Sequence, residues 1–132
     1  MTQLMLVCHQ GVGEALVAAA EVIVDHPLAV TVVPVRYIDD PDRSGRCVAR
    51  QLKRLGLTGP VLVLTDLPGA TPHNTALQAA SNADPPAPVV TGLNLPMLLR
   101  ALNHLDVAPL ELADMVEQGA CRAIISGSRH EA

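Results

Sequence analysis

Short apolar runs alternate with amphipathic segments along the whole chain. The apolar runs are rich in valine and leucine and have the length of strands, which predicts strands at residues 4–8, 30–35, 61–65, 89–91 and 121–126. The segments between them carry apolar residues at helical spacing, which predicts helices at residues 14–24, 44–55, 72–80, 95–105 and 109–117. This alternation indicates a single α/β domain over residues 1–132, doubly wound, with mainly parallel strands and helices on both faces of the sheet.

The strand order follows from the size of the chain. A chain of 132 residues suits the flavodoxin-like arrangement, so we expect the first four strands in the order 2-1-3-4. Strands 1 and 3 are then direct neighbours, about 4.8 Å apart. The last predicted strand, at residues 121–126, follows two helices instead of one, and the pattern alone leaves its direction open.

Two polar residues stand where neighbouring strands of this sheet end. His9 follows the first apolar run, and Asp66 follows the third. Because parallel strands end at the same edge, the two side chains are expected to meet at the topological switch point, where α/β sheets bind ligands. Asp66 would accept a hydrogen bond from Nδ1–H of His9, which leaves Nε2 unprotonated and nucleophilic. The pair therefore predicts a catalytic nucleophile and its orienting partner.

The loop that follows Asp66 has the composition of a phosphate cradle. Thr71-Pro72 predicts a helix start, with Thr71 as the N-cap and Pro72 as the first helical residue. Gly69 and Ala70 bring the backbone close to a ligand, and the free N–H groups of a helix N-terminus favour phosphate. The Thr71 hydroxyl and these amides would stabilise a phosphoryl group during its transfer to His9, with no cofactor.

Composition excludes several classes of function. The formal net charge is -4 and Tyr37 is the sole aromatic residue, so the chain has neither the positive charge nor the stacking platform of a nucleic-acid binder. No apolar stretch approaches the roughly 18 residues that span a bilayer. The N-terminus lacks the positive flank of a signal peptide, and the three cysteines form no C-x-x-C pair. We expect a cytoplasmic protein that does not insert into the membrane.

Metal, hydrolase and nucleotide chemistry are also disfavoured. The five histidines and three cysteines show no ligand spacing. Cys8 and His9 are adjacent in a strand and point to opposite faces, so they cannot share a metal or form a Cys–His hydrolase pair, and Cys8 is expected to be a buried core thiol. The sequence has no G-x-G-x-x-G fingerprint, no P-loop and no aromatic pair to hold a flavin ring.

Three blocks of sequence resemble the mannose-type IIA family of the bacterial sugar phosphotransferase system. They are Cys8-His9 after the first strand, DLPGATPHN at residues 66–74 and GLNLPML at residues 92–98. The second block is similar to the family pattern D-x-x-G-[AG]-[ST]-P-x-N, and the third to G-x-N-[IL]-P-M-L. The blocks stand in the family's order and span most of the domain, which makes the set specific.

The resemblance implies a function and a set of partners. It implies that His9 accepts phosphate from an HPr-type phosphocarrier and passes it to a IIB protein during sugar uptake, with Asp66 orienting the histidine and Thr71 contacting the phosphate. It also implies a homodimer in which residues 121–126 form an antiparallel edge strand exchanged between the subunits. Such a domain does not carry sugar specificity, so no sugar is implied.

Some features depart from the family pattern, and some interpretations stay open. The nucleophile lies in Cys8-His9-Gln10 where T-H-G is common, and Pro68 replaces a bulkier residue. With no fused IIB segment, the chain would pass phosphate to a separate IIB protein, act as a regulatory module switched by phosphorylation of His9, or donate phosphate to a dihydroxyacetone kinase. Asn94 and Pro96 either form only a strand-to-helix turn or line the pocket and contact a partner. His73 either reaches the pocket or is an exposed residue of the first helical turn.

Overall fold

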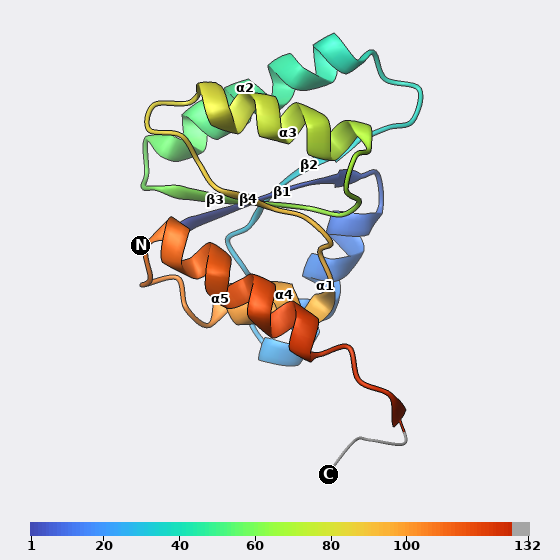
Figure 1. The fold of residues 1–132 in the computed structure, drawn as a ribbon, viewed down its shortest axis with the longest axis vertical. Helices are drawn as coiled ribbons and strands as arrows, with labels where there is room; N and C mark the ends of the chain where they lie inside the picture. The colour runs from blue at the N-terminus through green and yellow to red at the C-terminus, as the bar shows by residue number, and fades with distance from the viewer. Residues whose placement is uncertain (128–132) are drawn as a thin grey trace.

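The computed structural model describes residues 1–127, which form a three-layered α/β domain (Figure 1). The parallel strands are β1 (Gln3–His9), β2 (Thr31–Val35), β3 (Val61–Thr65) and β4 (Val89–Val90), in the order β2-β1-β3-β4. The helices are α1 (Val12–Val24), α2 (Pro41–Gly56), α3 (Thr71–Asn82), α4 (Leu95–Leu102) and α5 (Pro109–Arg122). Helices α2 and α3 cover one face of the sheet, and α1, α4 and α5 cover the other (Figure 1). The predicted fold class and strand order are confirmed.

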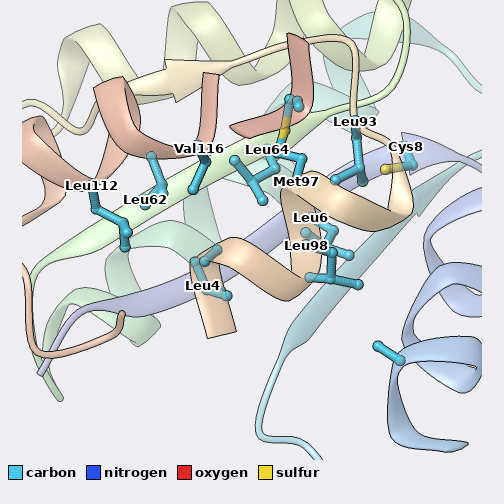
Figure 2. Packing of buried hydrophobic residues seen from close by; sticks show 13 residues of the cluster. Leu4, Leu6, Cys8, Leu62, Leu64, Leu93, Met97, Leu98, Leu112 and Val116 are labelled. Atoms are coloured by element: carbon cyan, nitrogen blue, oxygen red, sulfur yellow. The ribbon is translucent and has the colours of Figure 1, made fainter. Parts of the chain in front are cut away.

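Alternating residues of the central strands build two apolar cores. On β1, Leu4, Leu6 and Cys8 pack with α1, α4 and α5 (Figure 2), whereas Met5 and Val7 pack with α2 and α3. All five residues are at most 2% exposed, as expected for a parallel strand covered on both faces. Cys8 is thus a core thiol, as the alternation predicts.

Helices α1 and α2 begin earlier than the apolar periodicity indicates, because local hydrogen bonds start them. The Glu14 carboxylate accepts the Gly11 N–H at 3.2 Å, and Gly11 takes the left-handed conformation (φ 96°) that glycine tolerates. At the start of α2, the Asp40 side chain accepts the Asp42 N–H at 3.2 Å, and Pro41 occupies the first turn. Both starts lie at the edge of the sheet where the strands end.

Strand β2 lies at one edge of the sheet and contains a proline. Pro34 pairs in register with Cys8 of β1 and is exposed. Proline lacks an N–H and is tolerated in a sheet where that position faces outward from an edge strand. The sequence V-P-V therefore requires β2 to be an edge strand. The order β2-β1-β3-β4 places it at an edge of the sheet.

The C-terminal part of the described chain differs from the prediction. Helix α5 runs through Gly119 to Arg122, since Val116 and Ala120 are buried and the Arg100 side chain lies over Gly119, where a Cβ would meet Arg100 Cγ at 3.2 Å. The predicted start of the strand at residues 121–126 is therefore wrong, because residues 121 and 122 belong to α5. Within residues 1–127 the segment after α5 contains no strand, and it extends away from the body (Figure 1).

Helix α4 also ends earlier than predicted, at Leu102 instead of residue 105. The N–H and hydroxyl of Thr2 donate to the carbonyls of Leu105 and Val107 at 2.7 and 2.6 Å, which requires a turn there. Among residues 1–127, no helix is both long and apolar enough to cross a bilayer.

Candidate active site

His9 and Asp66 meet at the carboxyl edge of the sheet. The register of β1 and β3 pairs Val7 with Thr65, so the two chains run side by side as they reach this edge. Asp66 Oδ2 lies 2.8 Å from His9 Nδ1 and also accepts the backbone N–H of His9 at 2.9 Å. The predicted contact between the two side chains is therefore present, and the carboxylate holds both the ring and the backbone of the histidine.

The hydrogen bonds of Asp66 determine which ring nitrogen of His9 is free. Its other oxygen, Oδ1, accepts the Leu67 N–H at 2.9 Å, so both carboxylate oxygens act as acceptors. The proton between Asp66 and His9 then belongs to Nδ1, because an ionised carboxylate offers only acceptors. The Asp66 side chain is 10% exposed and that of His9 is 36% exposed. A shielded carboxylate thus orients a solvent-accessible imidazole, and Nε2 is the ring nitrogen that Asp66 does not contact.

The loop between β3 and α3 is held in a tight turn. Gly69 has φ 80°, a left-handed conformation that favours glycine, and a Cβ added there would meet nothing within 4 Å. The backbone conformation, not a lack of space, therefore requires glycine. The Asn74 side-chain amide donates to the Gly69 carbonyl at 3.0 Å, and the Ala70 N–H donates to the Leu67 carbonyl at 3.3 Å.

Thr71 occupies a different position in the helix from the one predicted. The Asn74 N–H donates to the Ala70 carbonyl at 3.0 Å, so Ala70 is the N-cap and Thr71 is already helical. The assignment of Thr71 as N-cap is therefore wrong. No side chain caps α3 within the described chain, and the exposed Thr71 hydroxyl has no protein partner there. The hydroxyl and the uncapped first turn are both available to an anion.

His73 is paired with a residue that the sequence pattern does not single out. Its Nδ1 lies 2.9 Å from the hydroxyl of Thr65, the last residue of β3, which is fully buried. His73 itself is half-buried, so the interpretation as an exposed residue of the first turn is wrong. The signal in the sequence is a lone hydroxyl at the end of the apolar run V-L-V-L-T, because a buried hydroxyl requires a partner.

Asn94 and Pro96 form the start of α4. The Asn94 side chain accepts the Met97 N–H at 2.9 Å, and Pro96 occupies the first turn. In the described residues no hydrogen bond joins Asn94 to His9 or Asp66. The Leu93 N–H donates to the Thr65 carbonyl at 3.0 Å, which ties this loop to the end of β3. The geometry thus gives Asn94 a capping role, and any contact with a partner would be additional.

Cys8 does not compete with His9 as a nucleophile. The thiol is fully buried, and burial raises its pKa to about 12, with further contributions from the negative charges of Asp66 and Glu14. Because the thiolate is the reactive form, a thiol with this pKa is inert at neutral pH. In residues 1–127, no three His, Cys, Asp or Glu side chains are grouped so that they would hold a metal ion.

Apolar side chains are exposed in the loop beside His9. The Gln10 N–H donates to the Val35 carbonyl at 3.0 Å, which places the loop after β2 next to the histidine. The Asp39 carboxylate accepts the backbone N–H and the Nε–H of Arg36, both at 2.9 Å, and this braces the loop. Tyr37 and Ile38 at its tip are 98% and 81% exposed.

The fold and this geometry define a class of protein: a flavodoxin-like α/β domain with a histidine–carboxylate pair at the switch point of its sheet. The chain belongs to the EIIA-man family, whose model, described as the PTS system fructose IIA component, matches residues 3–118. PTS denotes the phosphotransferase system. Membership implies, in general terms, a phosphotransferase role in sugar transport, with phosphocarrier and IIB partners.

Solved structures agree with this assignment. The chain is similar to the mannose/sorbose specific IIA subunit of the phosphotransferase system from Enterococcus faecalis, with 32% identity, 99% of this chain and 98% of that chain covered, and a TM-score of 0.86. It is also similar to a phosphotransferase system EIIA component from Streptococcus agalactiae, with 25% identity, coverage of 98% and 100%, and a TM-score of 0.82. A PTS IIA protein associated with the fucose utilization operon from Streptococcus pneumoniae shares the fold at 23% identity, coverage of 94% and 92%, and a TM-score of 0.80. No curated protein matches the sequence.

Proposed function

We propose that His9 carries a phosphoryl group from an HPr-type donor to a IIB protein. The observation that supports this most strongly is the 2.8 Å contact between His9 Nδ1 and Asp66 Oδ2, which leaves Nε2 free on an accessible ring. The proposal includes a cytoplasmic location, as the sequence pattern predicts.

The transfer is a pair of in-line displacements at phosphorus. The Nε2 lone pair of His9 forms a bond to phosphorus while the bond between phosphorus and the donor's leaving atom breaks, and the leaving atom keeps that electron pair. The Nδ1 proton stays in place, and Asp66 stabilises the positive character that the ring acquires. In the second step a nucleophile of the IIB protein attacks the same phosphorus, and His9 regains its lone pair.

The start of α3 is the proposed electrostatic partner of the phosphoryl oxygens. Phosphoryl transfer depends on neutralising charge that is spread over these oxygens. The first turn of α3 has no side-chain cap, so its N–H groups and the positive end of the helix dipole remain available. The Thr71 hydroxyl adds a donor, and Gly69 and Ala70 shape the approach of the backbone.

Intact mass after incubation with phosphoenolpyruvate, enzyme I and HPr tests the proposal. We expect one acid-labile phosphate per chain, which is lost when a IIB protein is added. A phosphate that forms but is never passed to any IIB protein would contradict the transport role. Absence of phosphate on folded protein would contradict the phosphocarrier role itself.

We also expect Tyr37 and Ile38 to contact the donor, because a protein that reaches His9 must cover the adjacent loop. In a Tyr37→Ala, Ile38→Ser double variant, the half-saturating HPr concentration should rise about tenfold, since truncating an interface anchor typically costs more than 1 kcal/mol. The maximal rate of phosphorylation should not change. Rapid-quench kinetics over a range of HPr concentrations measures both quantities.

Leu57→Ser is the control for this experiment. Leu57 is 84% exposed and lies at the C-terminal end of α2, at the edge of the sheet opposite His9. It should leave both kinetic quantities unchanged. An equal effect of the control, or an unchanged half-saturating concentration in the double variant, would rule out the proposed contact.

We further propose a homodimer in which the segment that follows α5, residues 123–126, exchanges between subunits as an antiparallel strand. Ile124 and Ile125 are 80% and 52% exposed in the single chain, and burying them would favour such an exchange. Sedimentation analysis should show a dimer for the wild type and a monomer for Ile124→Asp, Ile125→Asp. Leu110→Asp, at a position that is 76% exposed on α5, should remain dimeric. A monomeric wild type would refute the exchange.

A further inference from the structure

The end of β3 carries a buried hydroxyl whose partner is a histidine of the next helix. Thr65 is fully buried, and its hydroxyl lies 2.9 Å from His73 Nδ1. Thr75 Oγ1, by contrast, donates to the carbonyls of its own helix at 2.9 and 3.1 Å. The Thr65–His73 pair therefore links α3 to the sheet, whereas the Thr75 bonds act only within α3.

Thr65 is the point at which three loops of the carboxyl edge are connected. Its carbonyl accepts the Leu93 N–H at 3.0 Å, which holds the loop before α4. Its hydroxyl contacts His73, and the next residue along the chain is Asp66, which binds His9. Through Thr65, the first turn of α3 is placed in a fixed position relative to the ring of His9.

The other hydrogen bonds of the β3–α3 loop do not supply this connection. Asn74 donates to Gly69, and the Ala70 N–H donates to Leu67, so these bonds shape the loop internally. Within residues 1–127, the Thr65–His73 bond is the one side-chain hydrogen bond that joins α3 to a strand. Without it, the loop could keep its turn while the first turn of α3 shifted relative to β3.

We propose that His73 is a positioning residue for phosphoryl transfer, acting through Thr65 on the placement of Thr71 and the α3 amides. This inference rests on the proposed function, because it concerns the rate at which His9 is phosphorylated. An in-line transfer is sensitive to small displacements, and a misplacement of about 1 Å costs on the order of 100-fold in rate. A loosened helix start that still samples the correct position should lower the maximal rate about tenfold.

Four variants test the role of the hydrogen bond. His73→Leu removes the ring, and Thr65→Val removes the hydroxyl while keeping the shape of the side chain. His73→Asn retains a polar group near the position of Nδ1 and should preserve the rate. We expect each single removal to lower the maximal single-turnover rate about tenfold. The variant carrying both His73→Leu and Thr65→Val should be no slower than either single variant, because both changes delete the same bond.

The dependence of the rate on HPr concentration separates positioning from other roles. The half-saturating HPr concentration should stay at its wild-type value, because the bond is made at the fully buried Thr65 and not on the exposed surface that a donor would cover. His104→Leu is the matched control, since His104 also uses Nδ1 in a hydrogen bond, to the Arg100 carbonyl at 2.9 Å. It should keep the wild-type rate. Denaturant unfolding shows which variants are folded. If His73→Leu does not fold, the rates of Thr65→Val and His73→Asn test the inference.

Several outcomes would overturn the inference. A wild-type rate in folded His73→Leu or Thr65→Val would show that the bond does not position the cradle. Additive losses in the double variant, or failure of His73→Asn to preserve the rate, would show that His73 acts in another way. If the wild-type protein takes up no phosphate at all, the proposed function fails and this inference fails with it, whereas phosphorylation at equal rates in wild type and variants refutes this inference alone.

Discussion

Replacing His9 by alanine is expected to abolish phosphate uptake. The change removes the imidazole whose Nε2 is accessible and whose orientation Asp66 fixes. Neither neighbouring candidate can replace it, since the Cys8 thiol is buried with its pKa raised to about 12 and His73 is engaged with Thr65. The fold should survive, because the deleted ring is partly exposed, its hydrogen bond to the carboxylate contributes only about 1.5–3 kcal/mol, and Asp66 still accepts the backbone N–H of residue 9.

Intact mass and circular dichroism measure the two parts of this expectation. The variant should show no acid-labile phosphate after exposure to phosphoenolpyruvate, enzyme I and HPr, while its spectrum matches the wild type. His26→Ala is the control, because the exposed His26 also uses Nδ1 in a hydrogen bond, with the Pro27 carbonyl, and should still allow uptake of one phosphate. An alanine variant at position 9 that still carries phosphohistidine would move the site to another histidine.

Replacing Asp66 by asparagine is expected to slow phosphorylation by about 10²- to 10⁴-fold, the usual contribution of a positioned acid–base group, with the upper value matching the loss when a catalytic histidine loses the carboxylate that sets its tautomer. Both oxygens of Asp66 accept N–H donors: Oδ2 from His9 and Oδ1 from Leu67. An asparagine must place its NH₂ group at one of these positions. If the NH₂ group takes the position of Oδ2, it faces the backbone N–H of His9 and favours the tautomer with the proton on Nε2. If it takes the position of Oδ1, it faces the Leu67 N–H. Either orientation leaves a donor unpaired, at a cost to stability of about 1–3 kcal/mol.

Single-turnover kinetics and denaturant unfolding separate the two effects of this substitution. Asp39→Asn is the matched control, because Asp39 also accepts a backbone N–H in a loop at the carboxyl edge, that of Arg36 at 2.9 Å. It should lose some stability and keep the maximal rate of phosphorylation at saturating HPr, because Asp39 braces only the loop proposed to contact the donor. A rate for Asp66→Asn within threefold of the wild type would show that the carboxylate does not set the tautomer of His9.

The contact between His9 and Asp66 could be predicted because it depends on few assumptions. Two apolar runs that each end in a polar residue, on strands that the fold makes neighbours, must bring those residues to the same edge. The core could be predicted for a similar reason, since alternation along a strand decides which face each side chain covers. In both cases the residue pattern within each strand gives the direction of the side chains, and the strand order gives the neighbouring strand.

Features that depend on the third dimension could not be predicted in this way. Gly119 looks like a helix terminator until the packing of Arg100 against it is known, and that packing carries α5 to Arg122. The position of Thr71 depends on which carbonyl the Asn74 N–H selects, a difference of one residue in a turn. The pairing of His73 with Thr65 joins residues eight apart through a turn whose shape the sequence suggests only at Gly69.

The proline in β2 limits how this sheet can grow. The Val35 carbonyl accepts from Gln10 on the side of β1, so the backbone of the preceding residue, Pro34, faces the open side of β2. Without an N–H, Pro34 cannot donate to a strand added there, and extension on that side is disfavoured. Addition of a strand is then favoured beyond β4. If a sheet accepts another strand at one edge only, two copies that pair through that edge leave no free edge for a third copy. Association through the sheet edges therefore ends in a dimer instead of an open-ended fibre.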